Sequence, residues 1–506
     1  MSKLATLPGQ GLPEWTEMGQ ASGLDPLGMA RPTEVVYQSL LPGISTITNR
    51  LRYYSFFPWI LDRYARDSGS TSREEFFQFQ RRSEALFALV GVAGRYNNGL
   101  SGANWASGLL VMDGDVIDFG ATAERLDGKG YLKNKGGALG AIYGPQLREM
   151  NLVGSSSKHD LPVTTERGDR MATCMAASIG PAARVFVHAV QTGRATRSDI
   201  EAMSVLKPSA IEPGSPEQAM LAATLLGDLE DANEVDVSRR GTMLRILRYA
   251  RESGALPSAY ALRWAWFSGR IDTTQPSSAP IDPWVAYQAN DLLRLGYETL
   301  LKRAVEILEV APGKSSRLGA LLEGVIEEVS GSAIGGGGFV SQPEASASTQ
   351  DISGTIENVG DTLARVSDEA ITGAINLIRM MLSWAQANRV QVDALFPRSS
   401  PFQSLSSELA FVEQLGAIPT RHIVEAIVRE RILKRHLWVA SRKFSGQSAY
   451  TYLFEPDDGQ LRYRSTLVVA PSSPRLTQAI QFLEDAQLLD QDAGISSLGA
   501  DALDAA

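Results

Sequence analysis

The spacing of apolar side chains along the chain predicts a mainly α-helical protein. Residues 284–310 carry the strongest pattern, a broad apolar face on one long helix. The side chains of this face are Leu292, Leu293, Leu295, Tyr297, Leu300, Leu301, Ile307 and Leu308. Residues 34–66 predict two helices with a break between them, and residues 72–93 predict a further helix that begins with a capping box of Ser72 and Glu75. We expect β structure only as small wings and hairpins.

Two segments share one order of features: an apolar helix end, a short apolar strand, a polar turn and a capped helix. In residues 129–180, Thr165 and Gly168 begin the second helix of this order. Near the end of the chain, Ser496 and Gly499 stand at the corresponding positions. Such an order is typical of winged-helix modules, so we predict two winged-helix-like modules in a multidomain helical protein. The alternative is that any helix followed by a hairpin produces the same order.

A hairpin is expected shortly before the second of these modules. The sequence Pro-Asp-Asp-Gly at residues 456–459 is a turn signal, and the flanking residues are rich in β-branched and aromatic side chains. Residues 436–444 have a similar composition, and we interpret them as part of the same β region.

Composition along the chain suggests five parts. Residues 331–352 are rich in Gly, Ser and Ala and predict a flexible linker. The expected parts are an N-terminal arm (1–30), a helical domain with the first winged-helix-like module (31–190), a helical domain (191–330), the linker, and a helical region with the second module (353–506).

The charge balance restricts the kind of nucleic-acid surface that the chain can have. Its 506 residues carry a formal net charge of −9, which argues against non-specific DNA binding by the whole surface. Residues 421–445 are locally basic, with seven Lys or Arg and two Glu. The candidate nucleic-acid contacts are Arg431, Lys434, Arg435, Arg442 and Lys443, with Lys133 and Lys135 near the first module.

Several features indicate a cytoplasmic protein. The one cysteine, Cys174, excludes an intramolecular disulfide framework and a Cys-rich zinc site. No run of eighteen apolar residues is present, so no membrane partner is expected, and the N-terminus does not have the pattern of a signal peptide.

The sequence predicts no catalytic, cofactor or metal residues. Residues 311–316 contain Gly-Lys-Ser, but Leu308 stands where a phosphate-binding loop needs a glycine. The four histidines lack metal-ligand spacing, and we expect solvated or capping roles for His159 and His436. The acidic residues 228–236 are interpreted as a solvated loop, and Cys174 as a packed small side chain. An enzyme whose site is assembled from distant residues remains an alternative.

Residues 40–66 combine arginines and aromatics in one short stretch. We expect Ser45 or Thr46 to cap the following helix, and Pro58 to kink or restart it. Two interpretations of this stretch are open. Arg50 and Arg52, with the aromatic residues Tyr53, Tyr54 and Trp59, can form a phosphate-contacting and base-stacking surface, or they can tie a buried helix to neighbouring loops. The second interpretation is favoured because the acidic chain offers many internal partners.

Residues 42–60, PGISTITNRLRYYSFFPWI, resemble the signature of an uncharacterised bacterial family. The resemblance rests on Pro42-Gly43, Ser45-Thr46, Arg50, Arg52-Tyr53 and Pro58-Trp59. Members of that family resemble components of mobile or anti-phage defence islands, so the resemblance implies a biological setting and no reaction.

The leading hypothesis is therefore a DNA-binding or scaffold subunit of a bacterial defence system. Its partners would be the other subunits of that system and DNA. The main alternative is a protein-interaction subunit that does not bind nucleic acid.

Overall fold

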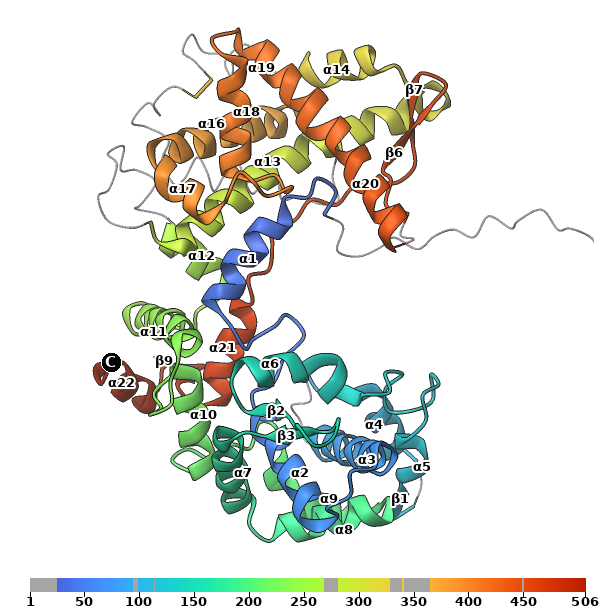
Figure 1. Ribbon diagram of the computed structural model, residues 1–506, viewed down its shortest axis with the longest axis vertical. Coiled ribbons are helices and arrows are strands. Elements are labelled where there is room, and N and C mark those ends of the chain that lie inside the picture. Colours follow the sequence, from blue (N-terminus) through green and yellow to red (C-terminus); the bar gives the residue numbers. More distant parts are fainter. Residues whose placement is uncertain are drawn as a thin grey trace, which may run out of the picture. The chain divides into compact units, whose positions relative to one another are not determined.

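The chain is mainly helical, with four small antiparallel sheets among the described residues (Figure 1). The computed structural model describes residues 25–93, 99–112, 114–267, 281–327, 339–340, 365–447 and 450–506. Residues 1–24 of the expected arm, and all of the expected linker except residues 339–340, lie outside this set.

Contacts divide the chain into two units, and each unit is built from separate segments. Unit 1 contains residues up to 33, residues 271–282 and residues 286–472. Unit 2 contains residues 34–270, 283–285 and 473–506. The five linear parts expected from composition do not coincide with these units. The last 34 residues belong to unit 2, although almost 190 residues of sequence separate them from the rest of that unit.

Unit 2 is built around α2 (Tyr53–Asp67), which lies beside α7 and α3 (Figure 1). Aromatic and aliphatic residues occur on every face of α2, so the helix is surrounded by other elements, and residues 53–61 are all buried. Pro58 lies inside this helix without ending it. The other helices of unit 2 are α3 (Arg73–Val92), α4 (Ala103–Leu110), α5 (Gly120–Ala123), α6 (Gly144–Glu149), α7 (Glu166–Ile179), α8 (Ala182–Thr192), α9 (Arg197–Ala202), α10 (Pro216–Leu226), α11 (Glu234–Ser253), α12 (Ala259–Phe267), α21 (Leu476–Asp485) and α22 (Ser497–Asp504).

The first hairpin module of unit 2 consists of α6, β2 (Val153–Ser155), β3 (Pro162–Thr164) and α7. A π-helical segment, residues 139–143, leads into α6. The Thr165 hydroxyl accepts from the Gly168 backbone N–H at 3.1 Å, and the Thr165 N–H donates to the carbonyl of Leu152 at 3.3 Å. A Cβ on Gly168 would lie 2.0 Å from that carbonyl oxygen, so only glycine fits where α7 crosses the strand.

The second hairpin module consists of α21, β8 (Leu489–Asp490), β9 (Gly494–Ile495) and α22. The Ser496 hydroxyl accepts from the Gly499 N–H at 3.0 Å, and the Ser496 N–H donates to the carbonyl of Leu488 at 3.2 Å. A Cβ on Gly499 would lie 2.0 Å from this carbonyl oxygen. The residues paired in the sequence analysis thus make the same hydrogen bonds, and the same local backbone is built twice in unit 2.

The remaining sheet of unit 2 pairs β1 (Val116–Asp118) with β4 (Arg194–Thr196). Thr196 and Asp199 form a capping box at the start of α9, directly after β4.

Unit 1 surrounds α13 (Pro283–Val310), and residues 286–302 of this helix are all buried. The expected apolar face is therefore only part of what is buried. Arg294 donates to Asp291 at 3.0 Å and to Glu298 at 2.7 Å, so the buried charges are paired along the helix itself. The helices around it are α14 (Leu318–Ile326), α16 (Asp368–Ala387), α17 (Arg389–Leu395), α18 (Leu405–Leu415), α19 (Thr420–Ala426) and α20 (Lys434–Gln447), with a π-helical segment at residues 427–433. Residues 30–33 of α1 (Ala30–Leu40) also belong to unit 1.

The expected hairpin is present in unit 1. Strands β6 (Phe454–Asp457) and β7 (Gln460–Tyr463) pair across Asp458 and Gly459, which both have positive φ as a tight two-residue hairpin turn requires. Strand β5 (Ser315–Ser316) adds to the free edge of β7.

Two local predictions are wrong. Residues 436–444 are helical, within α20, and not β: His436, Val439 and Ala440 are buried at helical spacing, and this period outweighs the aromatic content. Ser45 and Thr46 do not cap α2. The Ser45 N–H donates to the Thr48 hydroxyl at 2.9 Å in a separate turn, and α2 begins after Arg52 without a side-chain cap.

Among the described residues, no single helix is long and apolar enough to cross a membrane. Only α7 and α8 taken together meet the length and composition criteria, and they are bent by 104° relative to each other.

Candidate functional site

Arg50 and Arg52 are buried in unit 2 and paired with carboxylates. Arg50 binds Asp485 of α21 through two nitrogens, at 3.0 and 2.8 Å, and the Leu51 N–H donates to the same carboxylate at 2.9 Å. Arg52 binds Glu217 of α10 through two nitrogens, at 3.0 and 2.7 Å. Burial raises the pKa of Asp485, and the Arg50 guanidinium opposes that rise. Both arginine side chains therefore face protein and are not presented to a phosphate.

The three aromatic residues of the same stretch are also buried. The Tyr53 ring stacks on Tyr143 of the π-helical segment with centroids 4.3 Å apart. The Tyr54 hydroxyl donates to the carbonyl of Gly43 at 2.6 Å, and its ring meets Phe482 of α21 edge-on. Trp59 is 1% exposed. No face of these rings is open for base stacking.

The stretch contacts both hairpin modules. The Gly43 N–H donates to Glu149 of α6 at 2.6 Å, and Arg50 binds the last residue of α21. A third buried ion pair joins α7 to α11, because Arg167 binds Asp236 at 2.9 Å. The acidic segment 228–236 is thus not wholly solvated: Asp236 is fully buried, and its pKa is lowered by Arg167 and Arg239 against the effect of burial. The ion pairs tie the modules to the core of unit 2.

The five candidate contacts between residues 431 and 443 do not form one free cationic face. Arg431 pairs with Glu408, whose side chain is fully buried. Arg435 donates to the carbonyls of Leu27 and Pro401, and Lys443 donates to the carbonyl of Asp25. Lys434 is exposed and pairs with Glu430 at 2.7 Å. Arg442 is exposed too, and it lies over the ring of Trp438.

The two histidines discussed above differ from each other. His436 is buried: its Nε2 accepts from the Leu453 N–H at 2.9 Å, and its Nδ1 lies 3.2 Å from the carbonyl of Pro26. His436 is 1% exposed, so the expectation of a solvated or capping role is wrong for this residue, and the burial lowers its pKa to about 4. His159 lies in the turn between β2 and β3, where it accepts from the Leu161 N–H.

Lys133 and Lys135 are exposed in the loop before the first hairpin module. Lys135 lies over the ring of Phe77 at 5.6 Å. Phe77 also lines a cavity of about 230 Å³, together with Arg148 of α6 and Ser155 of β2. Lys158, in the hairpin turn, is likewise exposed. None of these cations makes an ion pair with another described residue.

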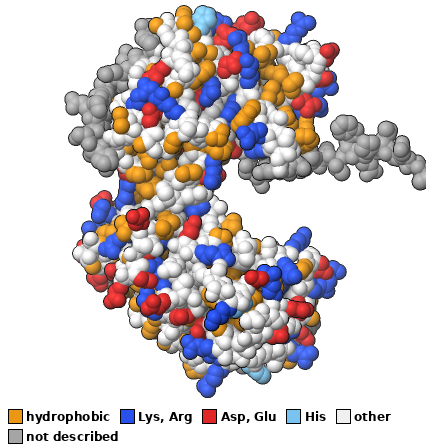
Figure 2. Space-filling view, viewed as in Figure 1, with side chains coloured by type: hydrophobic (Ala, Val, Ile, Leu, Met, Phe, Trp, Pro, Cys, Tyr) orange, Lys and Arg blue, Asp and Glu red, His pale blue; other side chains and the backbone are white. Residues whose placement is uncertain are grey.

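Elsewhere on the visible surface, basic and acidic side chains are interspersed (Figure 2). Among the residues that Figure 2 colours by type, neither unit shows a broad surface of only positive or only negative side chains.

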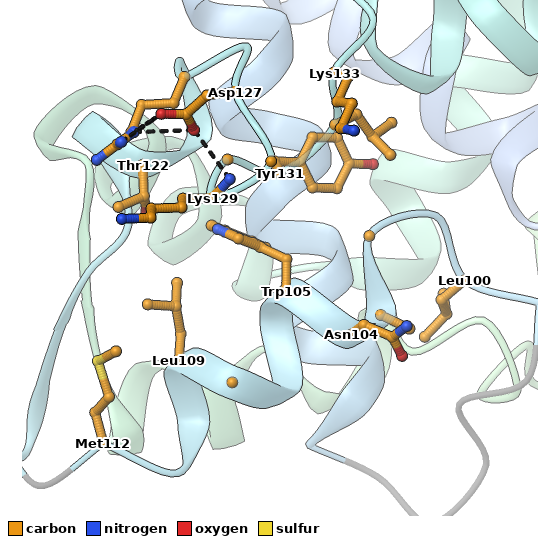
Figure 3. Close-up of a pocket in the computed structure, with 17 residues that line it drawn as sticks. Leu100, Asn104, Trp105, Leu109, Met112, Thr122, Asp127, Lys129, Tyr131 and Lys133 are labelled. Carbon is orange, nitrogen blue, oxygen red and sulfur yellow. Dashed lines mark hydrogen bonds and ion pairs between the residues drawn. The ribbon is translucent and has the colours of Figure 1, made fainter. Parts of the chain in front are cut away.

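A cavity of unit 2 has a volume of about 870 Å³ (Figure 3). It lies between α4 and the loop of residues 125–133. Trp105 and Leu109 project from α4, and Lys129 and Lys133 come from the loop. The sequence predicts a contact role for Lys133 but gives no signal for Trp105, since a lone tryptophan in a short helix belongs to no motif.

Two further observations concern chemistry. In the part of the chain that is described, no group of three or more His, Cys, Asp or Glu residues is placed to hold a metal ion. The Gly-Lys-Ser of residues 313–315 follows directly after α13 in a 3-10 turn and a two-residue strand, where Lys314 lies over the ring of Tyr463. This is not the strand–loop–helix context of a phosphate-binding loop.

None of the protein-family models, curated proteins or solved structures compared with the chain matches it.

Proposed function

We propose that this chain is a DNA-binding or scaffold subunit of a bacterial defence system, and that its two hairpin modules are winged-helix-like. The order of helix, two antiparallel strands and capped helix supports the second part of the proposal. The defence setting is carried over from the resemblance of residues 42–60.

The proposal of DNA binding is supported by the set of cations around the first hairpin module. Lys133 and Lys135 precede the module, Arg148 lies on α6 and Lys158 lies in the hairpin turn, and all four side chains are exposed. Lysine and arginine side chains without a carboxylate partner are free to contact phosphate. The first module is therefore the proposed DNA contact, and the segment 431–443 is less suited because three of its five cations hold unit 1 together.

Fluorescence anisotropy with labelled duplex DNA tests this role. A protein that contacts about four phosphates loses roughly a hundred-fold in affinity between about 50 and 200 mM salt. We expect such a loss for the native chain. Negligible binding at both salt concentrations would remove DNA binding from the proposal.

Two sets of variants locate the contact. Replacing Lys133, Lys135 and Lys158 together with alanine should weaken duplex binding and flatten its salt dependence. The matched control replaces Lys434 and Arg442, the exposed cations of the other candidate segment, and should leave the affinity unchanged. The reverse result would move the contact to unit 1.

The second hairpin module favours a different partner. Asp490 at the end of β8 and Asp492 in the turn that follows are both exposed and add negative charge, so the module would repel phosphate. This charge supports the scaffold role, with a basic protein surface as the partner of the second module. Co-purification with neighbouring gene products, lost on Asp490→Lys and Asp492→Lys, would support it. Retention of all partners by this variant would contradict it.

A further inference from the structure

The cavity beside α4 has the size and lining of a small-molecule site. Its volume of about 870 Å³ lies within the range of ligand pockets, roughly 300 to 1,000 Å³. One side is apolar, formed by Leu100, Leu109 and Met112, and the other side carries polar and charged groups of the loop. The two kinds of surface face each other across the cavity, as a ligand with an apolar part and a charged part would require.

Two aromatic rings form part of the lining. Trp105 and Tyr131 meet edge to face, with centroids 5.6 Å apart. A Cβ at Gly102 would lie 2.2 Å from the Tyr131 ring, and Gly102 has a φ of +76°, so glycine is needed there for the ring to take this position. Tyr131 is 2% exposed and supports Trp105 by packing, whereas Trp105 is only half-buried, so the indole is the ring that a planar ligand can contact.

The indole N–H of Trp105 has no hydrogen-bond partner among the described residues, although the nitrogen atom is buried. An unsatisfied buried donor costs about 1–3 kcal/mol. Figure 3 shows the indole directed from α4 toward Thr122 and Lys129, within the cavity lining. A ligand with an acceptor at this position would remove the cost.

The charged side of the cavity has an excess of cations. Arg125 pairs with Asp127, and the hydrogen bond from Arg125 lowers the pKa of that carboxyl group, which therefore neutralises Arg125. Lys129 and Lys133 are exposed and make no ion pair with a described residue. Two lysines thus remain available for an anionic group.

We propose that this cavity binds a nucleotide unit. The base lies against Trp105, the indole N–H donates to an acceptor of the ligand, and the phosphate is held by Lys129 and Lys133. Aromatic stacking and cationic phosphate contacts together are how proteins hold single nucleotides of a strand. The unit can come from a free mononucleotide or from an unstacked residue of a single strand. Duplex contact by the first hairpin module is not required, although Lys133 serves both proposals.

Calorimetric titration of the full chain with AMP, GMP, CMP and UMP tests the proposal. We expect at least one of them to bind, and its nucleoside, which lacks the phosphate, to bind at least about ten-fold more weakly. Trp105→Phe keeps a ring and removes the N–H, and should weaken binding by about five-fold. Replacing Lys129 and Lys133 with alanine should weaken binding at least about ten-fold and reduce its salt dependence.

Lys158→Ala is the matched control, because this lysine lies on the hairpin turn and outside the cavity. It should leave nucleotide affinity unchanged and weaken duplex binding. The two affinities are measured separately, so each proposal can fail independently of the other. A second titration with a short single-stranded oligonucleotide separates the two sources of the ligand. Binding of the oligonucleotide alone, weakened by the same variants, assigns the site to a strand.

Two results would overturn the proposal. One is the absence of binding by all four mononucleotides and by the oligonucleotide. The other is binding that Trp105→Phe and the double lysine variant leave unchanged while thermal melting shows both variants to be folded.

Discussion

Arg50 and Asp485 are separated by 435 residues in the sequence and form a buried ion pair with two hydrogen bonds. The pair joins the segment just before α2 to the end of α21, and so connects the core of unit 2 to its second hairpin module. This role follows from burial: the two side chains are 7% and 3% exposed, so neither has water as an alternative partner.

Arg50→Ala should therefore destabilise the protein strongly. Removal of one partner leaves a buried charge, which costs about 3–5 kcal/mol in free energy of unfolding. Chemical denaturation measures this cost, and Asp485→Asn should show a loss of similar size. The control is Arg63→Ala, whose exposed pair with Asp67 contributes less than about 1 kcal/mol. A stable Arg50→Ala protein would contradict the structural role.

Gly168→Ala and Gly499→Ala should each destabilise unit 2. In both cases the new methyl group would overlap a backbone carbonyl oxygen, which cannot move without breaking the hairpin. We expect a loss of about 1–3 kcal/mol, measured by thermal or denaturant melting. Gly241→Ala is the control: Gly241 is an exposed helical residue of α11 with open space at its Cβ, so alanine should stabilise by about 0.5–1 kcal/mol. Equal effects at all three positions would show that the clash does not govern the hairpin modules.

Arg431→Ala should destabilise unit 1, whereas Lys434→Ala should not. Loss of Arg431 leaves the buried carboxylate of Glu408 with two neutral side-chain donors, the hydroxyls of Tyr297 and Ser407. Lys434 is paired only with Glu430 at the surface, where such a pair contributes little. Melting curves of the two variants make the comparison, and a larger effect for Lys434 would reverse the assignment of their roles.

Glu84 should make unit 2 less stable as the pH rises. Burial raises the pKa of Glu84 from 4.5 to about 7, against the hydrogen bonds from the N–H groups of Ala138 and Leu139, the hydrogen bond from Gln80 and the charge of Arg81. The folded chain thus keeps a proton that the unfolded chain releases. This contribution to stability is fully present below about pH 4.5 and is lost as the pH rises through 7.

The measurement is the free energy of unfolding between about pH 5 and 8. Glu84→Gln should reduce the decrease seen over this range, and the variant should resemble the native chain most closely at the acidic end. An identical decrease in both proteins would show that Glu84 does not bind the proton.

The sequence predicted caps and turns well, because such features depend on a few neighbouring residues. The structure has the cap formed by Thr165 and Gly168, and it has the hairpin turn formed by Asp458 and Gly459. Prediction failed at His436, whose basic neighbours indicated solvent, because its burial depends on Pro26 and Leu453. Partners that lie hundreds of residues away leave no local pattern.

The candidate sites show the same limit. Lys133, Lys135 and Arg431 were all predicted as contacts from their charge alone. Only the structure shows that the two lysines are exposed, whereas Arg431 neutralises Glu408. Trp105 could not be identified, because its significance is the missing partner of its indole N–H.

The division of unit 2 between distant segments has a consequence for biosynthesis. Domains usually fold in order from the N-terminus as the chain is made. Here residues 473–506 supply Asp485, and the ribosome adds them only after every residue of unit 1. During translation, Arg50 therefore cannot pair with Asp485 until residues 473–506 have been made. Unit 1 can complete its fold before unit 2 does, although most of unit 2 is synthesised first.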